Sequence, residues 1–339
     1  MTGVALVTGG GGFIGSHLAR LLHERGLKVR VLDIAGAPEL PDGVEIRKGS
    51  ILDAAALASA LEGVECLYHL AANPDLWAAR PQSFLELNYH GTLAVLEAAR
   101  TARTPRVVYT STESILKGVR RTNGSVIDED SAPARLEDMP GPYCRSKFLA
   151  ERAAFAAAAS GMPIVIVNPT MPVGPGDRHL TPPSRMLLDY LNGRAPAYLD
   201  WECNLVDARD AALGHILAAE RGQTGENYIL GGHNLRFSAL LAELERLTGL
   251  AMPKRRVPYA LAYLSAVLSE TIAWATKRRP VAPLTGVRLA GSPMIFDHRK
   301  ASAELGFEPR PIAETLRDAI ADFARRNLLT RPVASNKSI

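Results

Sequence analysis

Residues 4–33 read VALVTGGGGFIGSHLARLLHERGLKVRVLD. The two ends of this stretch, 4–8 and 28–33, are short β-branched runs of the kind that form buried parallel strands. Between them, Phe13, Ile14, Leu18 and Leu22 recur at helical spacing and predict an amphipathic helix. A strand, a glycine turn, a helix and a second strand together make one βαβ unit.

The glycines of the turn are spaced G-x-x-G-x-x-G, at Gly9, Gly12 and Gly15. In such a turn the first glycine permits a tight bend, the second lets a pyrophosphate approach the backbone, and the third allows close helix–strand packing. The free N–H groups at the start of the helix then face the phosphates. Four consecutive glycines could also be only a flexible turn, but the flanking strands and helix favour a dinucleotide site.

Asp33 ends the second strand, where a carboxylate can accept the ribose hydroxyls of an adenosine. A carboxylate repels a 2′-phosphate, and no arginine directly follows Asp33. The sequence therefore predicts NAD as the cofactor rather than NADP.

The composition is that of an ordinary globular protein: 339 residues, 47% hydrophobic and 22% charged, with a net charge of +4. The charge is too evenly spread to indicate a nucleic-acid partner. Cys66, Cys144 and Cys203 are isolated, and the histidines lack ligand spacing, so neither a disulfide framework nor a metal site is expected. No secretory signal opens the sequence, which favours a cytoplasmic location.

Further strands are expected at 44–48, 66–70, 106–110 and 163–167, each separated from the next by a helical pattern. One of these helices is expected to run from Pro81 to Ala99 and another from Gly141 to Ser160. The alternation predicts an α/β fold with a Rossmann-type, doubly wound parallel sheet. A loop from Lys117 to Pro140 is long enough to serve as a lid.

Proline and glycine become frequent after Asn168, which marks the end of this first domain. We predict a dinucleotide-binding domain over 1–170, to which 204–232 returns. A smaller, mainly helical substrate domain is predicted over 171–203 and 233–329, and a flexible tail over 330–339.

Residues 257–279 contain a crowded apolar run, interrupted by Glu270 and closed by Lys277, Arg278 and Arg279. A spanning helix needs about 20 uninterrupted apolar residues, so this segment is too short to cross a membrane. The pattern favours a helix buried in the substrate domain. The alternative is an amphipathic helix at a membrane surface, with the basic residues at the headgroups, which would make the enzyme membrane-associated.

Tyr143 and Lys147 are the second strong signal, because positions i and i+4 lie on one face of a helix. An ammonium group beside a phenol lowers the phenol pKa, and such a tyrosine can exchange a proton with a substrate hydroxyl. Thr112 follows the fifth strand and could orient the same substrate oxygen. The alternatives are a surface Tyr–Lys pair and a threonine that only caps local backbone.

Several motifs occur together: 8–15, Asp33, Ala71-Ala72, Asn88-x-x-Gly91-Thr92, 109–112, Tyr143-x-x-x-Lys147 and Asn168-Pro169. In this combination the chain resembles the extended short-chain dehydrogenases/reductases over nearly its whole length. The resemblance implies a catalytic set of Thr112, Tyr143 and Lys147. It also implies that Asn88 orders the site and that Lys147 bonds the nicotinamide ribose.

The predicted cofactor-binding residues are Gly9, Gly12, Phe13, Ile14, Gly15, Asp33, Ser50, Ile51, Leu70, Ala71, Ala72, Tyr143, Lys147, Asn168 and Pro169. Ser50 departs from the pattern, because the family usually has an Asp there.

Within the family, residues 71–77, 146–152 and 228–232 are most similar to the hopanoid-associated sugar epimerases. That likeness implies a small-molecule or lipid-linked substrate, a sugar or polyol of hopanoid lipid synthesis. Dihydroflavonol reductases and 3β-hydroxysteroid dehydrogenases are more distant relatives with the same site. Few charged residues lie between Met171 and Trp201, and Trp77, Met171, Met186 and Tyr198 could line an apolar pocket, so a sterol-like or polycyclic ketone is the alternative substrate. The candidate substrate residues are Trp77, Glu113, Met171, Met186 and Tyr198.

Three further expectations follow from the resemblance. Glu113 keeps only one of the two acids of the sugar-nucleotide dehydratases, so dehydration is disfavoured. The helices at 81–103 and 141–160 would form the contact of a homodimer. A non-catalytic dinucleotide sensor is the alternative from another class of protein, and the Tyr–Lys pair argues against it.

Overall fold

A sheet of seven parallel strands forms the centre of the computed structural model, which describes residues 3–116, 126–131, 135–291 and 293–332. In spatial order the strands are β3 (Glu45–Lys48), β2 (Lys28–Asp33), β1 (Val4–Thr8), β4 (Val64–His69), β5 (Arg106–Thr110), β6 (Ile164–Pro169) and β9 (Asn227–Leu230). The order reverses between β1 and β4, as in a doubly wound sheet, and this confirms the predicted fold class.

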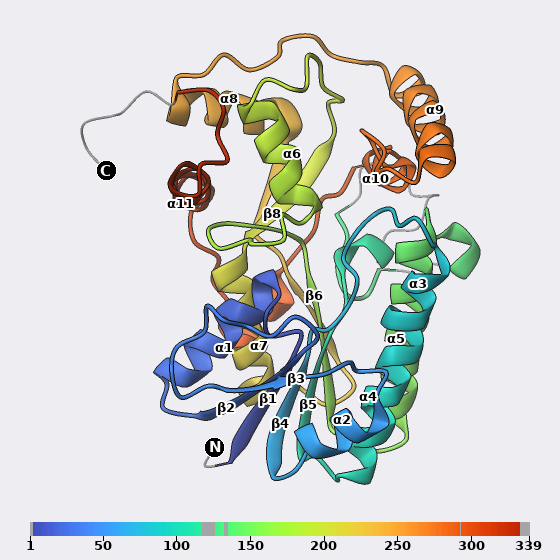
Figure 1. Cartoon of the computed structure of the whole chain (residues 1–339), viewed down its shortest axis with the longest axis vertical. Helices are drawn as coiled ribbons and strands as arrows, with labels where there is room; N and C mark the ends of the chain where they lie inside the picture. The colour runs from blue at the N-terminus through green and yellow to red at the C-terminus, as the bar shows by residue number, and fades with distance from the viewer. Residues whose placement is uncertain (1–2, 117–125, 132–134, 292, 333–339) are drawn as a thin grey trace.

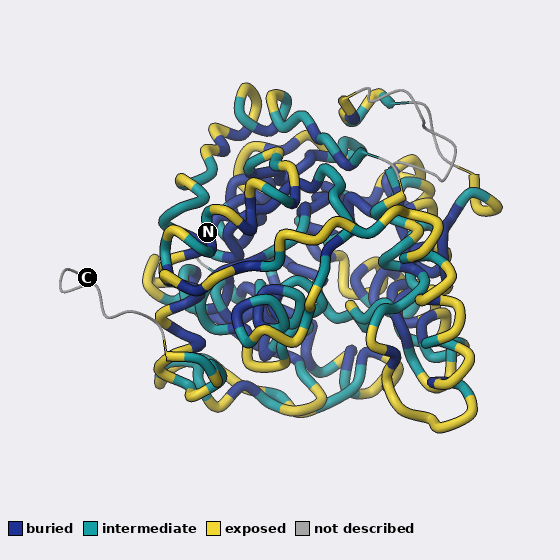
Figure 2. The backbone as a smooth tube through the Cα atoms, turned by 90° about the horizontal axis from the view of Figure 1, so that it is seen from above, coloured by how far each residue is buried: buried dark blue, intermediate teal, exposed yellow. Residues whose placement is uncertain are grey.

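Helices cover both faces of this sheet (Figure 1). On one face lie α1 (Phe13–Glu24) and α7 (Ala208–Arg221), and on the other lie α2 (Ala54–Ala60), α4 (Gly91–Thr101) and α5 (Pro142–Ala159). Neighbouring strand residues face opposite sides, so Val7 packs in the α1–α7 core and Leu6 in the α2–α4–α5 core. In Figure 2 the buried segments are concentrated inside the molecule and the exposed ones lie at its rim.

A smaller unit stands above the carboxyl ends of the strands (Figure 1). Its three-stranded sheet has the order β10 (His233–Arg236), β8 (Glu202–Asp207), β7 (Met171–Val173). Three helices pack around it: α6 (Pro182–Leu191), α8 (Phe237–Thr248) and α11 (Ile312–Arg325). The region is mainly helical, as predicted.

The segment 204–232 does not return to the large sheet as one piece. Only α7 and β9 rejoin it, whereas β8 pairs with β7 and β10. The reason is that β8 contributes to two cores: Leu205 packs with α6, α8 and α11, and Val206 packs with α1 and α7.

The helix predicted from Pro81 onward is divided into α3 (Gln82–Phe84), a π-helical turn η1 (Leu85–His90) and α4. The predicted long loop begins after the short helix η2 (Glu113–Ile115) and contains η3 (Leu136–Asp138). Its residues 117–125 and 132–134 lie outside the described residues, as do 333–339 of the predicted tail. Thr330, at the start of that tail, is fixed by hydrogen bonds to the side chain of Asn192.

The apolar segment after residue 257 forms α9 (Tyr259–Thr276), followed by α10 (Leu284–Ala290) and the π-helical turn η4 (Ala301–Leu305). The prediction that this helix is buried is wrong. Only Ala266 and Ala273 of α9 are buried, because these small residues face the protein, whereas Leu264 and Leu268 are each 63% exposed. Within the described part of the chain, no helix is long and apolar enough to cross a membrane.

Candidate active site

The glycine turn between β1 and α1 needs glycine at two positions. Gly9 has a φ of +73°, and a Cβ atom there would lie 2.7 Å from the backbone nitrogen of Ala71. A Cβ atom at Gly15 would lie 2.2 Å from the carbonyl oxygen of Gly9. Both distances are shorter than a real Cβ atom can approach another atom. The turn can therefore pack this closely against α1 and the end of β4 only because Gly9 and Gly15 have no side chain.

The start of α1 offers backbone donors beside this turn. No side chain caps the helix at Gly12, so its first N–H groups, at Phe13 and Ile14, point out of the helix end. At the end of β2, Asp33 accepts hydrogen bonds from the backbone N–H groups of Gly11 (3.0 Å) and Ala35 (2.9 Å). A carboxylate has about four acceptor positions, so Asp33 can still accept the hydroxyls of a ribose.

The adenine side of the predicted site contains Ser50 and Ile51. The hydroxyl of Ser50 accepts a hydrogen bond from the backbone of Leu52 at 3.1 Å, so it caps its own turn. The side chain of Ile51 is buried and lies against Gly91 of α4. These contacts position the loop that follows β3.

Tyr143 and Lys147 lie on the first turns of α5, beside the end of β5 where Thr112 follows the strand. The Thr112 side chain is close enough to Tyr143 to act on the pKa of its phenol, which it lowers. The Nζ atom of Lys147 donates to the hydroxyl of Tyr109 at 3.0 Å and to the carbonyl oxygen of Thr110 at 2.7 Å. One face of α5 is therefore joined to the carboxyl end of β5.

The pKa values in this pair differ from the sequence prediction. Burial lowers the pKa of the Lys147 ammonium to about 7. Burial and the charge of Glu113 raise the pKa of Tyr143, although the Thr112 side chain acts in the opposite direction. The expectation that Lys147 lowers the Tyr143 pKa is therefore wrong here, because among the described residues the ammonium donates to Tyr109 and Thr110 of β5 rather than to the phenol. Tyr143 is consequently a neutral phenol near pH 7.

Asn88 is fully buried in the π-helical turn η1. Its Oδ1 atom accepts a hydrogen bond from the backbone of Asn73 at 2.7 Å, and its Nδ2 atom donates to the Ser146 hydroxyl at 3.0 Å. Ser146 in turn donates to the carbonyl oxygen of Tyr143 at 2.8 Å. Asn88 thus ties the loop after β4 to the helix turn that carries Tyr143.

A buried histidine that sequence reasoning missed lies behind the site. His69, the last residue of β4, bonds the hydroxyl of Thr8 through Nδ1 (2.8 Å) and that of Thr92 through Nε2 (3.0 Å). Because Thr92 donates its own proton to the carbonyl oxygen of Asn88, Nε2 must be the protonated nitrogen. Burial lowers the His69 pKa to about 3, so this neutral ring fixes β1 and β4 beside each other at the glycine turn.

Asn168, in β6, faces the same strand ends. Its Nδ2 atom donates to the carbonyl oxygen of Thr112 (3.2 Å) and to the carboxylate of Glu151 (2.7 Å), whereas its buried Oδ1 atom has no partner among the described residues. Pro169 follows it in β6. The predicted cofactor residues Leu70, Ala71 and Ala72 lie half-buried after β4.

Of the predicted substrate residues, Glu113 and Trp77 lie near the site and Tyr198 does not. Burial raises the pKa of Glu113 to about 7, and its carboxylate accepts the Thr112 hydroxyl at 2.8 Å. Trp77 packs against Trp274 of α9, with ring centroids 5.8 Å apart. Tyr198 is instead buried in the core of the smaller unit, against Phe237, because it follows the apolar helix α6 into that core. Met171 and Met186 are partly buried against the same core.

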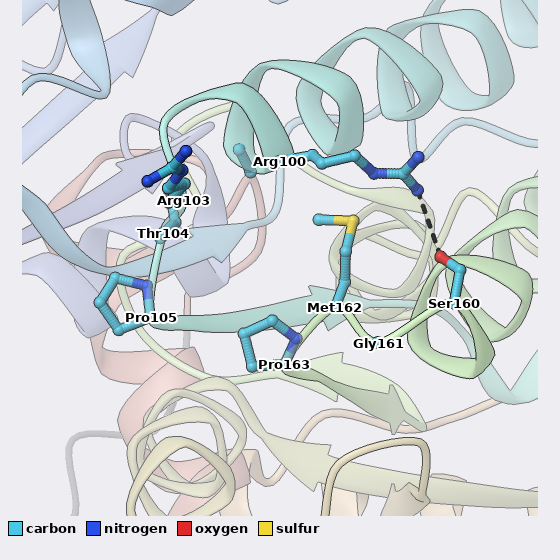
Figure 3. A pocket seen from close by; sticks show the side chains of 9 residues that line it. Arg100, Arg103, Thr104, Pro105, Ser160, Gly161, Met162 and Pro163 are labelled. Carbon is cyan, nitrogen blue, oxygen red and sulfur yellow. Dashed lines mark hydrogen bonds between the residues drawn. The ribbon is translucent and has the colours of Figure 1, made fainter.

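A separate hollow of about 420 Å³ lies at the opposite end of the sheet, where α4 and α5 end (Figure 3). Pro105 and Pro163 line it just before β5 and β6, and Arg100 spans it to Ser160. It is at the amino ends of the strands, whereas ligands of such sheets bind at the carboxyl ends, so it takes no part in the site.

The uncapped helix end, the glycine cradle, the carboxylate of Asp33 and the unpartnered oxygen of Asn168 fit a dinucleotide. With the neighbouring Tyr143 and Lys147 they define an α/β enzyme that binds a nucleotide cofactor. The sequence model of the NAD dependent epimerase/dehydratase family matches residues 5–231, and the chain belongs to this family of extended short-chain dehydrogenases/reductases. It is an NAD-dependent enzyme, as predicted.

Two relatives match nearly the whole chain. A putative dihydroflavonol 4-reductase of Synechocystis is 37% identical over 326 residues, covering 94% of this chain and 93% of the relative. The sterol demethylase protein B of Methylococcus capsulatus is 32% identical over 332 residues, covering 96% and 99%.

Two solved structures are similar over the same length. The crystal structure of gox2253 has a TM-score of 0.83 and 35% identity, covering 96% of this chain and 99% of its own. MoeE5, solved in complex with UDP-glucuronic acid and NAD, has a TM-score of 0.72 and 26% identity, covering 96% and 100%.

Proposed function

We propose that this enzyme transfers hydride between NAD and a secondary alcohol or its ketone, with reduction of the ketone as the favoured direction. The observation that carries the proposal is the placement of Tyr143 on the first turn of α5, which Lys147 joins to the same strand ends that hold Thr112 and the glycine turn. A phenol that keeps its proton near pH 7 is suited to giving that proton to a developing alkoxide.

Each member of the catalytic set then has one task. The site of the glycine turn, Asp33 and Lys147 would hold the cofactor, which would supply a hydride as NADH for reduction of the ketone or accept one as NAD+ for oxidation of the alcohol. The hydroxyl of Tyr143 donates its proton to that oxygen, so a ketone gains one hydride and one proton and becomes an alcohol. Thr112 would hold the same oxygen once its hydroxyl, which donates to Glu113 in the structure, turns toward it, and the reverse sequence oxidises the alcohol.

Lys147 supports this proton transfer indirectly, through its hydrogen bonds. Two of its three donors are used by Tyr109 and Thr110, and the third, which has no partner among the described residues, can bond the nicotinamide ribose.

We infer that the substrate is an apolar ketone or alcohol, in the class of sterol-like and polycyclic molecules. Trp77 and Trp274 supply aromatic surface beside the loop that follows β4. Two relatives over 30% identical are named putative dihydroflavonol 4-reductase and sterol demethylase protein B, which supports the same class.

The second candidate is epimerisation of a sugar or polyol linked to hopanoid synthesis. In that reaction the hydride would return to the opposite face of a transient ketone. The similarity to MoeE5, which was solved with a UDP-sugar and NAD, supports this candidate, as do the sequence motifs described above.

The test combines one variant with two substrate classes. Tyr143→Phe should bind NAD as the wild type does and lose at least about 10²-fold in turnover, because proton transfer contributes about 10²–10⁴-fold. Wild-type turnover of steroid ketones with free exchange of NADH would support the reductase. Conversion of a sugar by tightly retained NAD would instead support the epimerase. Undiminished activity of Tyr143→Phe would rule out the mechanism.

We also infer a homodimer, formed by the helices η1, α4 and α5. Leu85 and Leu93 on the first two are more than a third exposed, which is expected of side chains that pack in a subunit contact. Light scattering of the wild type and of Leu93→Glu would test it, with a monomer expected only for the variant.

A further inference from the structure

Helix α9 presents its large apolar side chains to solvent. Leu261, Leu264, Leu268 and Ile272 are spaced by three or four residues, and each is between 54% and 63% exposed. This spacing places them on one face of the helix. We call these four residues the leucine face. A monomeric protein rarely leaves a contiguous apolar patch of this kind uncovered, so the leucine face indicates a binding surface.

Basic residues flank α9 at both ends. Lys254, Arg255 and Arg256 precede it, and Lys277, Arg278 and Arg279 follow it. Three of the six form ion pairs, with Glu245, Asp200 and Asp75. The other three, Arg255, Lys277 and Arg278, are exposed and have no carboxylate partner among the residues that the structure describes.

Glu270 is the only acidic residue of α9 and is turned away from this surface. Its carboxylate accepts a hydrogen bond from the backbone of Leu284 at the start of α10, at 2.9 Å. The outward side of the helix therefore combines apolar side chains with positive charge at both ends. An anionic partner with an apolar interior complements this pattern.

A second copy of the chain fits less well. Pairing two leucine faces in either direction would bring the basic clusters of one copy close to those of the other, and like charges oppose such contact. A lipid surface has no such penalty. Amphipathic helices with basic flanks lie in the plane of anionic membranes, with the apolar side at the acyl boundary.

We propose that the leucine face docks on the surface of an anionic phospholipid bilayer, with the basic clusters at the headgroups. The helix would lie along the membrane, since no described helix can cross one.

This surface is joined to the proposed active site through α10. Helix α10 packs against α9, and its Arg288 donates to the carbonyl oxygen of Pro140 at 3.1 Å. Thr285 of the same helix is in contact with Gly141, the residue before α5. On the other side, Trp274 of α9 contacts Trp77. The bilayer would thus lie beside the entrance to Tyr143. On the basis of the proposed function, we infer that the substrate is dissolved in the membrane.

The docking is tested with the full chain and vesicles. Wild-type protein should sediment with phosphatidylcholine vesicles that contain 30% phosphatidylglycerol, and much less with pure phosphatidylcholine. Leu264→Gln combined with Leu268→Gln should reduce the partition coefficient at least tenfold. Lys277→Glu combined with Arg278→Glu should do the same, because each basic residue contributes roughly fivefold at such a surface.

The matched control is Ile46→Gln combined with Leu52→Gln, which removes exposed apolar side chains outside α9 and should bind like the wild type. The proposal is overturned if anionic vesicles fail to bind the wild type or if the α9 variants bind equally well. It is also overturned if the leucine face proves to mediate self-association without vesicle binding.

The substrate assignment has a separate readout. With a steroid ketone presented in vesicles, the α9 leucine variant should raise KM at least tenfold and leave kcat unchanged. With the same ketone in detergent micelles, both constants should match the wild type. Tyr143→Phe should bind vesicles normally, so failure of the proposed chemistry and failure of the docking are distinguishable. An equal KM in vesicles for wild type and variant would refute delivery from the membrane.

Discussion

The hydroxyl of Thr112 donates a 2.8 Å hydrogen bond to the carboxylate of Glu113, and both side chains are buried. This places a titratable acid next to the hydroxyl that acts on the pKa of Tyr143, and the charge of that acid raises the same pKa. Burial raises the pKa of Glu113 to about 7, so its charge changes within the working pH range. The polarity around Tyr143 therefore changes with pH because Glu113 gains or loses a proton, and not because Tyr143 does.

Glu113→Gln should change how stability depends on pH. The folded-state pKa of Glu113, about 7, lies above its ordinary value of 4.5, so the native state binds more protons between these values. The free energy of unfolding therefore falls as pH rises from 4.5 to 7 and is level above that. Relative to the wild type, the free energy of unfolding of the variant should rise by about 3 kcal/mol across this window. Urea denaturation at pH 4.5, 6 and 8 measures it, and parallel pH profiles would contradict it.

Lys147→Met should reduce kcat by at least about 10²-fold, because the ammonium that would hold the nicotinamide ribose and that joins α5 to β5 is lost, and misplaced reacting groups cost about this much. Methionine fills similar space, so folding should be retained, as circular dichroism can verify. The matched control is Arg145→Met, an exposed position on the same helix, for which we expect kcat within twofold of the wild type. Equal losses for the two variants would mean that the effect comes from the helix and not from the ammonium.

Gly15→Ala and Gly12→Ala should separate folding from cofactor binding. The added methyl at Gly15 meets the carbonyl oxygen of Gly9 at 2.2 Å, so we expect a loss of about 2–3 kcal/mol in the free energy of unfolding. At Gly12 the same oxygen is 3.1 Å away, so the fold should be little affected while NAD binds at least tenfold more weakly. Thermal melts and calorimetric titration with NAD measure the two effects. The opposite ranking in stability would show that the turn is arranged differently.

Asp33→Asn should raise the use of NADP relative to NAD. The amide keeps an acceptor for the glycine turn but removes the negative charge that repels a 2′-phosphate. We expect the ratio of kcat/KM for NADP to that for NAD to rise about tenfold, equivalent to about 1.4 kcal/mol. Steady-state rates with both cofactors provide the measurement. An unchanged ratio would mean that Asp33 does not face the ribose.

Local patterns in the sequence predicted the cofactor half of the fold well. The alternation of β-branched runs and helical spacing gives β1, α1 and β2 directly, because each pattern depends on neighbours in the chain. The spacing of Tyr143 and Lys147 likewise follows from helix geometry alone.

The features that were missed depend on distant partners. Lys147 bonds Tyr109, 38 residues earlier, and no local pattern indicates that its ammonium is used there. Similarly, the composition of α9 predicts a buried helix, but burial is decided by which face meets α10, and that face carries alanines. The placement of β8 in the smaller sheet depends on pairing with β7 and β10, which sequence periodicity does not encode.

The π-helical turn η1 has a consequence for insertions and deletions in this chain. A π-turn arises when one extra residue is accommodated within an α-helix, and it is common at functional sites. Removing a single residue from Leu85–His90 would let the segment relax into regular helix. Because the π-turn already absorbs the extra residue, the helical turns on either side would keep their orientation, and only side chains within Leu85–His90 would change direction. Asn88 would then lose its alignment with Asn73 and Ser146, so that a shortened helix would remain a helix and yet no longer hold the site.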